Sequence, residues 1–298
     1  MLLTVVAGCA PVVRLSLRPF YRPAPLLDDV RVARDIPYVM PSIGPAHPKQ
    51  RLDLYHSGGD ELGTLVFVHG GSFEEGDKDL EIGGLDIYGN VGRFYAAHGL
   101  AVAVVAYRLQ PEVTWPDQVD DVAAALAWTV RNAQERGGSG RIYLSGHSAG
   151  AWLASRVALD DGVLALHGLG ARQIAGVIAI SGSGFDLTDQ RTWELYPHED
   201  WWAERFWRPY ARGSWQEEAS LVPLVDSDAP PFLLLHADSE LRALERQNRL
   251  FLAALRRSGV ESELVPLRHG SHRRIVLAMS REDREVTERI LEFVGSAH

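Results

Sequence analysis

The chain has 298 residues, which is long enough for one large domain with a substantial core or for two small domains. Hydrophobic residues make up 46% of the chain and charged residues 23%, as is ordinary for a globular protein. The formal net charge is −9, and the lysines and arginines form no stripe. Nucleic-acid binding depends on neutralising phosphates, so this composition argues against that class of function.

The single cysteine, Cys9, excludes an intrachain disulfide framework and a cysteine-rich metal site. The sequence VVAGCA around it is similar to the lipobox of a bacterial lipoprotein signal, in which the cysteine is lipidated and the preceding residues are removed. Only eight residues precede Cys9, however, and none of them is Lys or Arg. Two interpretations stay open: an exported protein tethered to a membrane through Cys9, or a cytoplasmic protein with an apolar N-terminus. No other apolar run approaches the roughly 20 residues that a membrane span needs.

Residues 1–45 are predicted to be a signal-like N-terminus and an irregular arm, and residues 46–298 a single domain. Apolar runs typical of strands lie at residues 50–57, 64–71, 100–108, 141–146, 174–182, 231–237 and 261–267. Stretches with helical spacing lie at residues 115–138, 148–161, 244–259 and 280–296. This alternation predicts an α/β fold, in which a parallel sheet carries helices on both faces.

The segment 186–220 breaks the alternation and is rich in tryptophan. Five of the eight tryptophans lie here: Trp193, Trp201, Trp202, Trp207 and Trp215. We interpret the segment as a helical cap insertion that packs a small core and also forms an aromatic wall near the strand ends, where ligand sites are lined by such side chains. Trp201, Trp202 and Trp207 are therefore assigned to substrate binding.

The sequence GHSAG at residues 146–150 follows a predicted strand and begins a predicted helix. A sharp strand-to-helix turn holds its central residue at positive φ, and small residues on both sides avoid clashes with the neighbouring backbone. The turn presents Ser148 at the mouth of the sheet, above a helix N-terminus that stabilises negative charge. This context predicts a nucleophilic serine, with His147 beside it as a further substrate contact.

A serine nucleophile requires an oxyanion hole, a base and an acid. The sequence HGGSF at residues 69–73 ends an earlier strand, and its small residues can expose backbone N–H groups. We assign the oxyanion hole to the amides of Gly71 and Ser72, with the amide of Ala149 from the turn itself.

The base is expected late in the chain, after the last strand, where His269 and His272 are both candidates. The acid is expected after the strand at 231–237, where Asp238 and Glu240 are both candidates. Either carboxylate can hold a histidine in the required tautomer, and either can instead cap a helix.

Together these motifs resemble the α/β-hydrolase superfamily and, more closely, its carboxylesterase and kynurenine-formamidase-like branch. The segments that carry the resemblance are HGGSF, YRLQPEVTWPDQVDDVAAALAW, GHSAGAWLA, APPFLLLHADSE and GSHRRIV, within about residues 50–292. The resemblance implies a mostly parallel eight-stranded sheet, a Ser–acid–His triad and no cofactor.

By this resemblance, Ser148 matches the nucleophile of the family and His272 matches the base. His272 is chosen because members have an Ile/Val pair shortly after the catalytic histidine, which here is Ile275-Val276. Members usually have Asp four residues after the strand-end histidine, whereas this chain has Glu240 four residues after His236. That register favours Glu240 as the acid, with Asp238 as the alternative.

The resemblance implies a serine carboxylesterase that hydrolyses short-chain or aryl esters through an acyl-enzyme, with a small ester molecule as its partner. An arylformamidase that cleaves an N-formyl aromatic amide is the alternative. A third class, a binding protein without catalysis on the same fold, is disfavoured by the intact nucleophile, base and oxyanion motifs. The histidines are scattered and HExxH is absent, so no metal or cofactor is expected. No pattern in the sequence indicates an oligomeric state.

Overall fold

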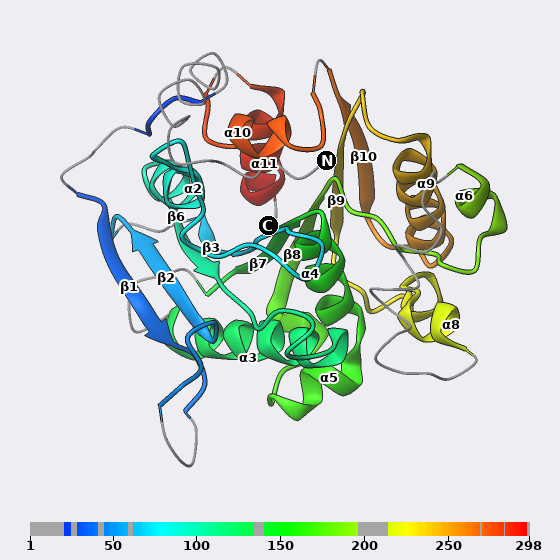
Figure 1. Cartoon of the computed structure of the whole chain (residues 1–298), viewed down its shortest axis with the longest axis horizontal. Coiled ribbons are helices and arrows are strands. Elements are labelled where there is room, and N and C mark those ends of the chain that lie inside the picture. The colour runs from blue at the N-terminus through cyan, green and yellow to red at the C-terminus, as the bar shows by residue number, and fades with distance from the viewer. Residues whose placement is uncertain are drawn as a thin grey trace.

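The computed structural model describes residues 21–24, 29–40, 45–58, 62–133, 140–195, 214–268, 270–282 and 284–296 (Figure 1). Cys9, the three tryptophans assigned to substrate binding and His269 lie outside these residues. Within the described part of the chain, no helix combines the length and apolar character needed to cross a membrane.

An eight-stranded sheet forms the centre of the molecule (Figure 1). Its strands are β1 (Arg31–Pro37), β2 (Arg51–His56), β3 (Gly63–Val68), β6 (Leu100–Val105), β7 (Ile142–His147), β8 (Ile174–Ile180), β9 (Phe232–Ala237) and β10 (Ser262–Leu267). They lie in the order β1-β2-β6-β3-β7-β8-β9-β10, and β2 pairs antiparallel with β1 and with β6. All other pairs are parallel, which confirms the mostly parallel eight-stranded sheet expected from the sequence. A separate short hairpin pairs β4 (Glu81–Ile82) with β5 (Leu85–Asp86).

The sheet begins upstream of residue 46, where the sequence placed the start of the domain. Residues 31–37 form β1, which pairs with β2 across a register shift between Ala33 and Ile36. The buried carboxylate of Asp53 accepts hydrogen bonds from the amide of Asp35 and from Arg34, and it forms an ion pair with Lys78. This polar cluster compensates the buried charge and attaches β1 to the sheet.

Helices cover both faces of the sheet. They are α2 (Ile87–Ala96), α3 (Trp115–Ala133), α4 (Ala149–Leu159), α5 (Asp161–Leu166), α6 (Gln190–Leu195), α8 (Trp215–Ala219), α9 (Arg242–Arg257), α10 (Arg274–Ala278) and α11 (Glu285–Ser296), with 3-10 turns η3 (Ala171–Gln173) and η5 (Val222–Leu224). Buried residues of α3, α4 and α9 form one core cluster, and those of α2, α10 and α11 form the other.

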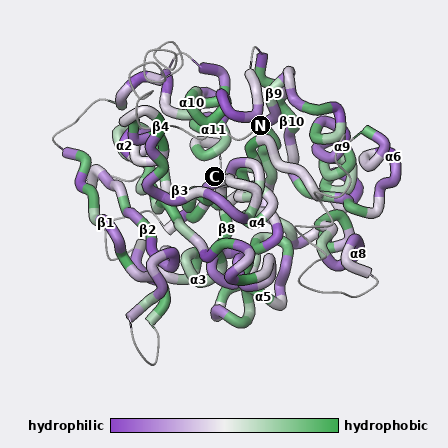
Figure 2. Tube along the Cα trace, in the orientation of Figure 1, coloured by the Kyte–Doolittle hydropathy of each residue, from purple (hydrophilic) through white to green (hydrophobic). Residues whose placement is uncertain are grey.

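The strands separate these two cores because successive side chains point to opposite faces. In β3, Val66 and Val68 contribute to the α3–α4–α9 side, whereas Leu65 and Phe67 contribute to the α2–α10–α11 side. A strand buried on both faces has no polar position to alternate with, which explains its continuous apolar sequence. The helices lie between core and solvent, and each therefore contains both hydrophobic and hydrophilic residues. The colours along α9 show this mixture (Figure 2).

The described part of the tryptophan-rich segment packs into the core. Trp193 and Trp215 meet edge to face with 5.8 Å between ring centroids, and Trp193 Nε1 donates to the carbonyl of Leu187. Trp215 is buried in the α3–α4–α9 core, and Trp193 packs against that core. A bidentate ion pair between Asp189 of this segment and Arg246 also attaches the segment to α9. These two tryptophans therefore have a packing role.

Candidate active site

Ser148 occupies the turn between β7 and α4 with φ 56° and ψ −120°, a conformation that residues with a Cβ rarely adopt. Its amide donates to the carbonyl of Ile180 in the neighbouring strand. A Cβ on Gly146 would overlap the carbonyl of Gly150, and a Cβ on Gly150 would overlap the carbonyl oxygens of Val68 and His69. Close backbone packing thus requires both glycines of the GHSAG sequence, and it holds the strained serine between them.

His272 lies on the loop between β10 and α10, and its Nε2 is 2.9 Å from Ser148 Oγ. For the serine hydroxyl to donate to Nε2, the ring must carry its proton on Nδ1. The structure therefore brings together two residues that are 124 positions apart in the sequence and that were matched to nucleophile and base.

The two candidate acids after β9 lie in different surroundings. Glu240 Oε1 is 3.5 Å from His272 Nδ1, and the Glu240 side chain is completely buried. Neither Glu240 carboxylate oxygen has a hydrogen-bond partner among the described residues, nor has His272 Nδ1. Burying a carboxylate without a compensating charge is energetically unfavourable. The nearby His272 imidazole is the group in this geometry that can supply such a charge when it is protonated.

Asp238 is exposed and turns to the backbone of the same loop. Its Oδ1 accepts a hydrogen bond of 3.2 Å from the amide of Gly270, whose carbonyl accepts from Ser239 Oγ. The carboxylate of Asp238 thus contacts the loop that carries His272, whereas Glu240 contacts the imidazole itself.

The loop after β3 lies beside the serine turn. A Cβ on Gly70 would lie 2.8 Å from the His147 carbonyl oxygen and 3.2 Å from Ser148 Cβ. The next three residues all have positive φ, with values of 128° at Gly71, 54° at Ser72 and 66° at Phe73. Among the described residues, no backbone–backbone hydrogen bond uses the amides of Gly71, Ser72 or Ala149.

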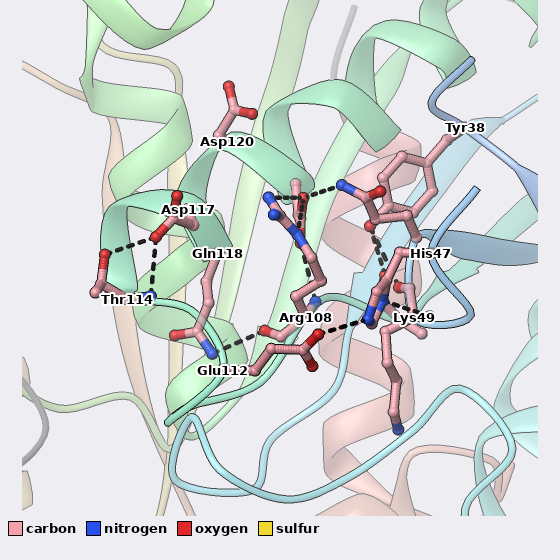
Figure 3. A network of polar contacts seen from close by, with 12 residues as sticks. Tyr38, His47, Lys49, Arg108, Glu112, Thr114, Asp117, Gln118 and Asp120 are labelled. Atoms are coloured by element: carbon pink, nitrogen blue, oxygen red, sulfur yellow. Dashed lines mark hydrogen bonds and ion pairs between the residues drawn. The ribbon is translucent and has the colours of Figure 1, made fainter. Parts of the chain in front are cut away.

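Gln118 holds this strained loop from α3. The Gln118 side chain is fully buried, and its Nε2 donates to the carbonyl of Phe73 at 2.8 Å and to that of Arg108 at 2.9 Å. Figure 3 shows Gln118 reaching back to the backbone at Arg108, whose guanidinium forms a bidentate pair with the buried Asp121. The amide of Gln110 gives the Phe73 carbonyl a second donor at 2.9 Å. Sequence reasoning missed Gln118, although a glutamine among the apolar positions of the helix at 115–138 was a signal.

His69, at the end of β3, supports the same loop. Its ring stacks on Tyr107 with 4.3 Å between centroids, and Nδ1 lies 2.7 Å from the carbonyl oxygen of Gly70. Burial lowers the pKa of His69 to about 4, so the ring is neutral near pH 7. Its Nδ1–H donates a hydrogen bond to the carbonyl oxygen of Gly70.

His147, assigned to substrate binding from the sequence, has a buried side chain in the structure. Its Nε2 lies 2.7 Å from the backbone carbonyl oxygen of His272, and the centroids of the His147 and His272 rings are 4.9 Å apart. Its described polar contact is therefore with the protein. The described residues include no cluster of three or more His, Cys, Asp or Glu side chains that could hold a metal ion.

Residues 65–275 match a family of proteins with the α/β hydrolase fold. Over 270 residues the chain is 29% identical to the esterase LipQ of Mycobacterium tuberculosis, a match that covers 88% of this chain and 61% of LipQ. It is also 29% identical over 236 residues to an isoprenylcysteine α-carbonyl methylesterase of Arabidopsis thaliana, covering 73% of this chain and 52% of the plant protein. The chain thus spans between about half and three fifths of these relatives.

Among solved structures, esterase B of Lactobacillus rhamnosis superposes with a TM-score of 0.74 at 22% identity, covering 97% of this chain and 91% of that one. An esterase of Pyrobaculum calidifontis superposes with a TM-score of 0.69 at 21% identity, covering 97% and 90%. At such identities the likeness shows the fold, which agrees with the sheet order described above. Because the family match covers more than half of the chain, this protein belongs to the α/β hydrolase fold family.

Proposed function

We propose that this protein is a serine carboxylesterase that hydrolyses short-chain or aryl carboxylic esters. The observation that carries the proposal is the 2.9 Å contact between Ser148 Oγ and His272 Nε2, made by a serine with strained backbone between a strand and a helix N-terminus. A hydroxyl that donates to a neutral imidazole can be deprotonated as it attacks a carbonyl carbon. The esterase names of the relatives favour an ester as the substrate.

In the proposed first step, Ser148 Oγ attacks the ester carbonyl while His272 Nε2 takes its proton. The C–O bond to the alcohol then breaks, and His272 returns the proton to the leaving alcohol. Water attacks the resulting acyl-enzyme by the same route and releases the carboxylic acid. Glu240 acts as the acid of the triad, because its buried carboxylate faces Nδ1 and stabilises the imidazolium that forms in both steps.

We assign the oxyanion hole to the amides of Gly71, Ser72 and Ala149. Ala149 is the first residue of α4, and the first amides of a helix have no intrahelical acceptor. The positive φ angles at Gly71 and Ser72 turn the loop after β3 beside Ser148. Amides fixed in this way can stabilise the negative charge that develops on the carbonyl oxygen.

The test is a series of initial rates on p-nitrophenyl esters from acetate to decanoate, with N-formylkynurenine alongside and the Ser148→Ala variant as the blank. We expect fast hydrolysis of the short esters, slow deformylation and no activity in the variant. Dominant deformylation would replace the esterase by an arylformamidase. Activity that survives Ser148→Ala would contradict the assignment of the nucleophile.

Membrane attachment through Cys9 is a separate proposal that rests on the sequence around that residue. It is tested by expressing the full chain in a bacterium with labelled palmitate. We expect label in the wild type and none in Cys9→Ser. Equal label in both would contradict lipidation at Cys9, and a protein recovered unlabelled would support the cytoplasmic alternative.

A further inference from the structure

His147 is a buried titratable side chain that the proposed acyl-transfer steps do not use. It precedes the nucleophile in the sequence, and it contacts the backbone of the base. Its Nε2 lies 2.7 Å from the carbonyl oxygen of His272. On its other side, a Cβ on Gly70 would lie 3.0 Å from His147 Nδ1, so the loop after β3 packs directly against the ring.

The partner determines where the proton of His147 lies. A carbonyl oxygen can only accept a hydrogen bond, so Nε2 must carry hydrogen. Burial, together with the neighbouring His272, lowers the pKa of His147 to about 3. The ring is therefore neutral near pH 7, with hydrogen on Nε2 and a lone pair on Nδ1. A neutral ring also adds no second positive charge beside the imidazolium of His272.

The loop that carries His272 has few other attachments at that residue. Among the described residues, no backbone–backbone hydrogen bond involves the amide or the carbonyl of His272. Neighbouring positions are held at Gly270, by Asp238 and Ser239, and at Ser271, whose carbonyl accepts from the first residues of α10. Within the described part of the chain, the hydrogen bond from the His147 side chain thus connects the backbone of His272 to β7.

We propose that His147 is a positioning residue, whose imidazole donates Nε2–H to the His272 carbonyl and so keeps the base within reach of Ser148 Oγ. The inference rests on the proposed function, because it assigns His147 a role in the reaction of Ser148 and His272. It also replaces the substrate contact that the sequence suggested for this side chain.

The experiment compares His147→Leu with His147→Gln, because the Nε2 of Gln can donate to the same carbonyl and Leu cannot. We expect Leu to lower kcat on p-nitrophenyl acetate about 100-fold, since misplacing a reacting group by about 1 Å has an effect of that size. KM should change less than about threefold, and Gln should recover most of kcat. Equal losses in Leu and Gln, or full activity in Leu, would overturn the proposal.

A matched control removes another histidine that bonds a carbonyl. His98 Nδ1 lies 2.7 Å from the carbonyl oxygen of Phe94, and its ring stacks on Phe94 at 4.3 Å. We expect His98→Leu to lower Tm while leaving kcat within about twofold of wild type, as for a structural contact outside the site. If His98→Leu and His147→Leu lowered kcat equally, general destabilisation would explain the effect and the proposal would fail.

Two readouts do not need ester turnover. The rate at which a fluorophosphonate labels Ser148 should fall in His147→Leu and recover in His147→Gln, and this holds even for a protein that hydrolyses none of the esters. Imidazole 15N NMR of the wild type should show His147 neutral and protonated on Nε2 from pH 5 to 8. A His147 signal that titrates in that range, or labelling rates that are equal in all variants, would overturn the proposal. A wild type that is labelled but inactive on esters would contradict the proposed function alone.

Discussion

Glu240 and Asp238 are two residues apart, yet their carboxylates meet different groups. Glu240 faces His272 Nδ1, whereas Asp238 accepts from the amide of Gly270. Glu240→Gln keeps the size of the side chain but removes the charge that, in the proposed mechanism, stabilises the imidazolium of His272. We expect it to lower kcat about 10⁴-fold, the size known for a neutralised triad acid. Asp238→Asn should lower kcat less than about tenfold, because an amide oxygen can still accept from Gly270. Rates on p-nitrophenyl acetate check both, and the opposite ranking would make Asp238 the acid.

Gly150 shows how a single methyl group can disturb the serine turn. A Cβ there would overlap two backbone carbonyls at the end of β3, which cannot move without displacing the central sheet. We expect Gly150→Ala to lower the free energy of unfolding by about 1–3 kcal/mol or more, as overpacking does. Gly170→Ala is the matched control, because a Cβ at Gly170 meets nothing within 4 Å. Urea unfolding followed by tryptophan fluorescence distinguishes them, and equal midpoints would contradict the packing argument.

At the scale of elements, α3 supports the loop after β3 through Gln118. Ser72 and Phe73, both non-glycine residues at positive φ, store strain, and the hydrogen bonds to the Phe73 carbonyl offset it. Gln118→Met has a similar volume and no donor. We expect it to lower the free energy of unfolding by about 1–3 kcal/mol, because the partly buried carbonyl of Arg108 loses this donor and the buried carbonyl of Phe73 keeps one of two.

The same Gln118→Met variant should also lower kcat about tenfold, because the loop is proposed to carry the oxyanion amides of Gly71 and Ser72, and loosening it would stabilise the oxyanion less well. Gln190→Met is the control, because Gln190 is exposed at the start of α6 and its replacement should change stability by less than about 0.5 kcal/mol. Steady-state kinetics and urea unfolding of both variants provide the test. A stability loss with unchanged kcat would contradict a role of Gln118 in supporting the proposed oxyanion amides.

At the scale of the whole molecule, two buried histidines couple stability to pH. The pKa values of His69 and His147 are lowered from 6.5 to about 4 and about 3. In the unfolded chain both bind protons below about pH 6.5, whereas in the folded protein they do so only below about pH 4 and pH 3. Protonation therefore favours unfolding, and stability should fall as pH drops from about 6.5 towards 4.

Each such histidine contributes a slope of at most about 1.4 kcal/mol per pH unit. Urea unfolding at pH 7, 6 and 5 measures it, in a range above about pH 4 where the lowered carboxylate pKa values, such as that of Asp189, have little effect. We expect His147→Gln to show a smaller slope than the wild type, because it lacks one of the two histidines whose pKa values burial lowers. An unchanged slope would contradict the lowered pKa of His147.

The sequence by itself determined the fold class and the strand-to-helix turn that holds Ser148. Both depend on local patterns: fully apolar strands alternate with amphipathic helices, and glycines flank Ser148 because adjacent backbone leaves no room for a Cβ. The matching of His272 to the base came from a resemblance, and the structure places its Nε2 beside Ser148 Oγ.

The tertiary structure decided what depends on contacts between distant segments. Asp238 and Glu240 are equivalent as residue types, and they differ because the chain after β9 buries one carboxylate against His272 and leaves the other at the surface. Gln118 and His147 have no local signature of their roles, since each acts on a carbonyl that lies on another loop. Local pattern predicts where an element begins and which face is buried, but the partner of a buried polar group is set only when the sheet brings separate loops to the same edge.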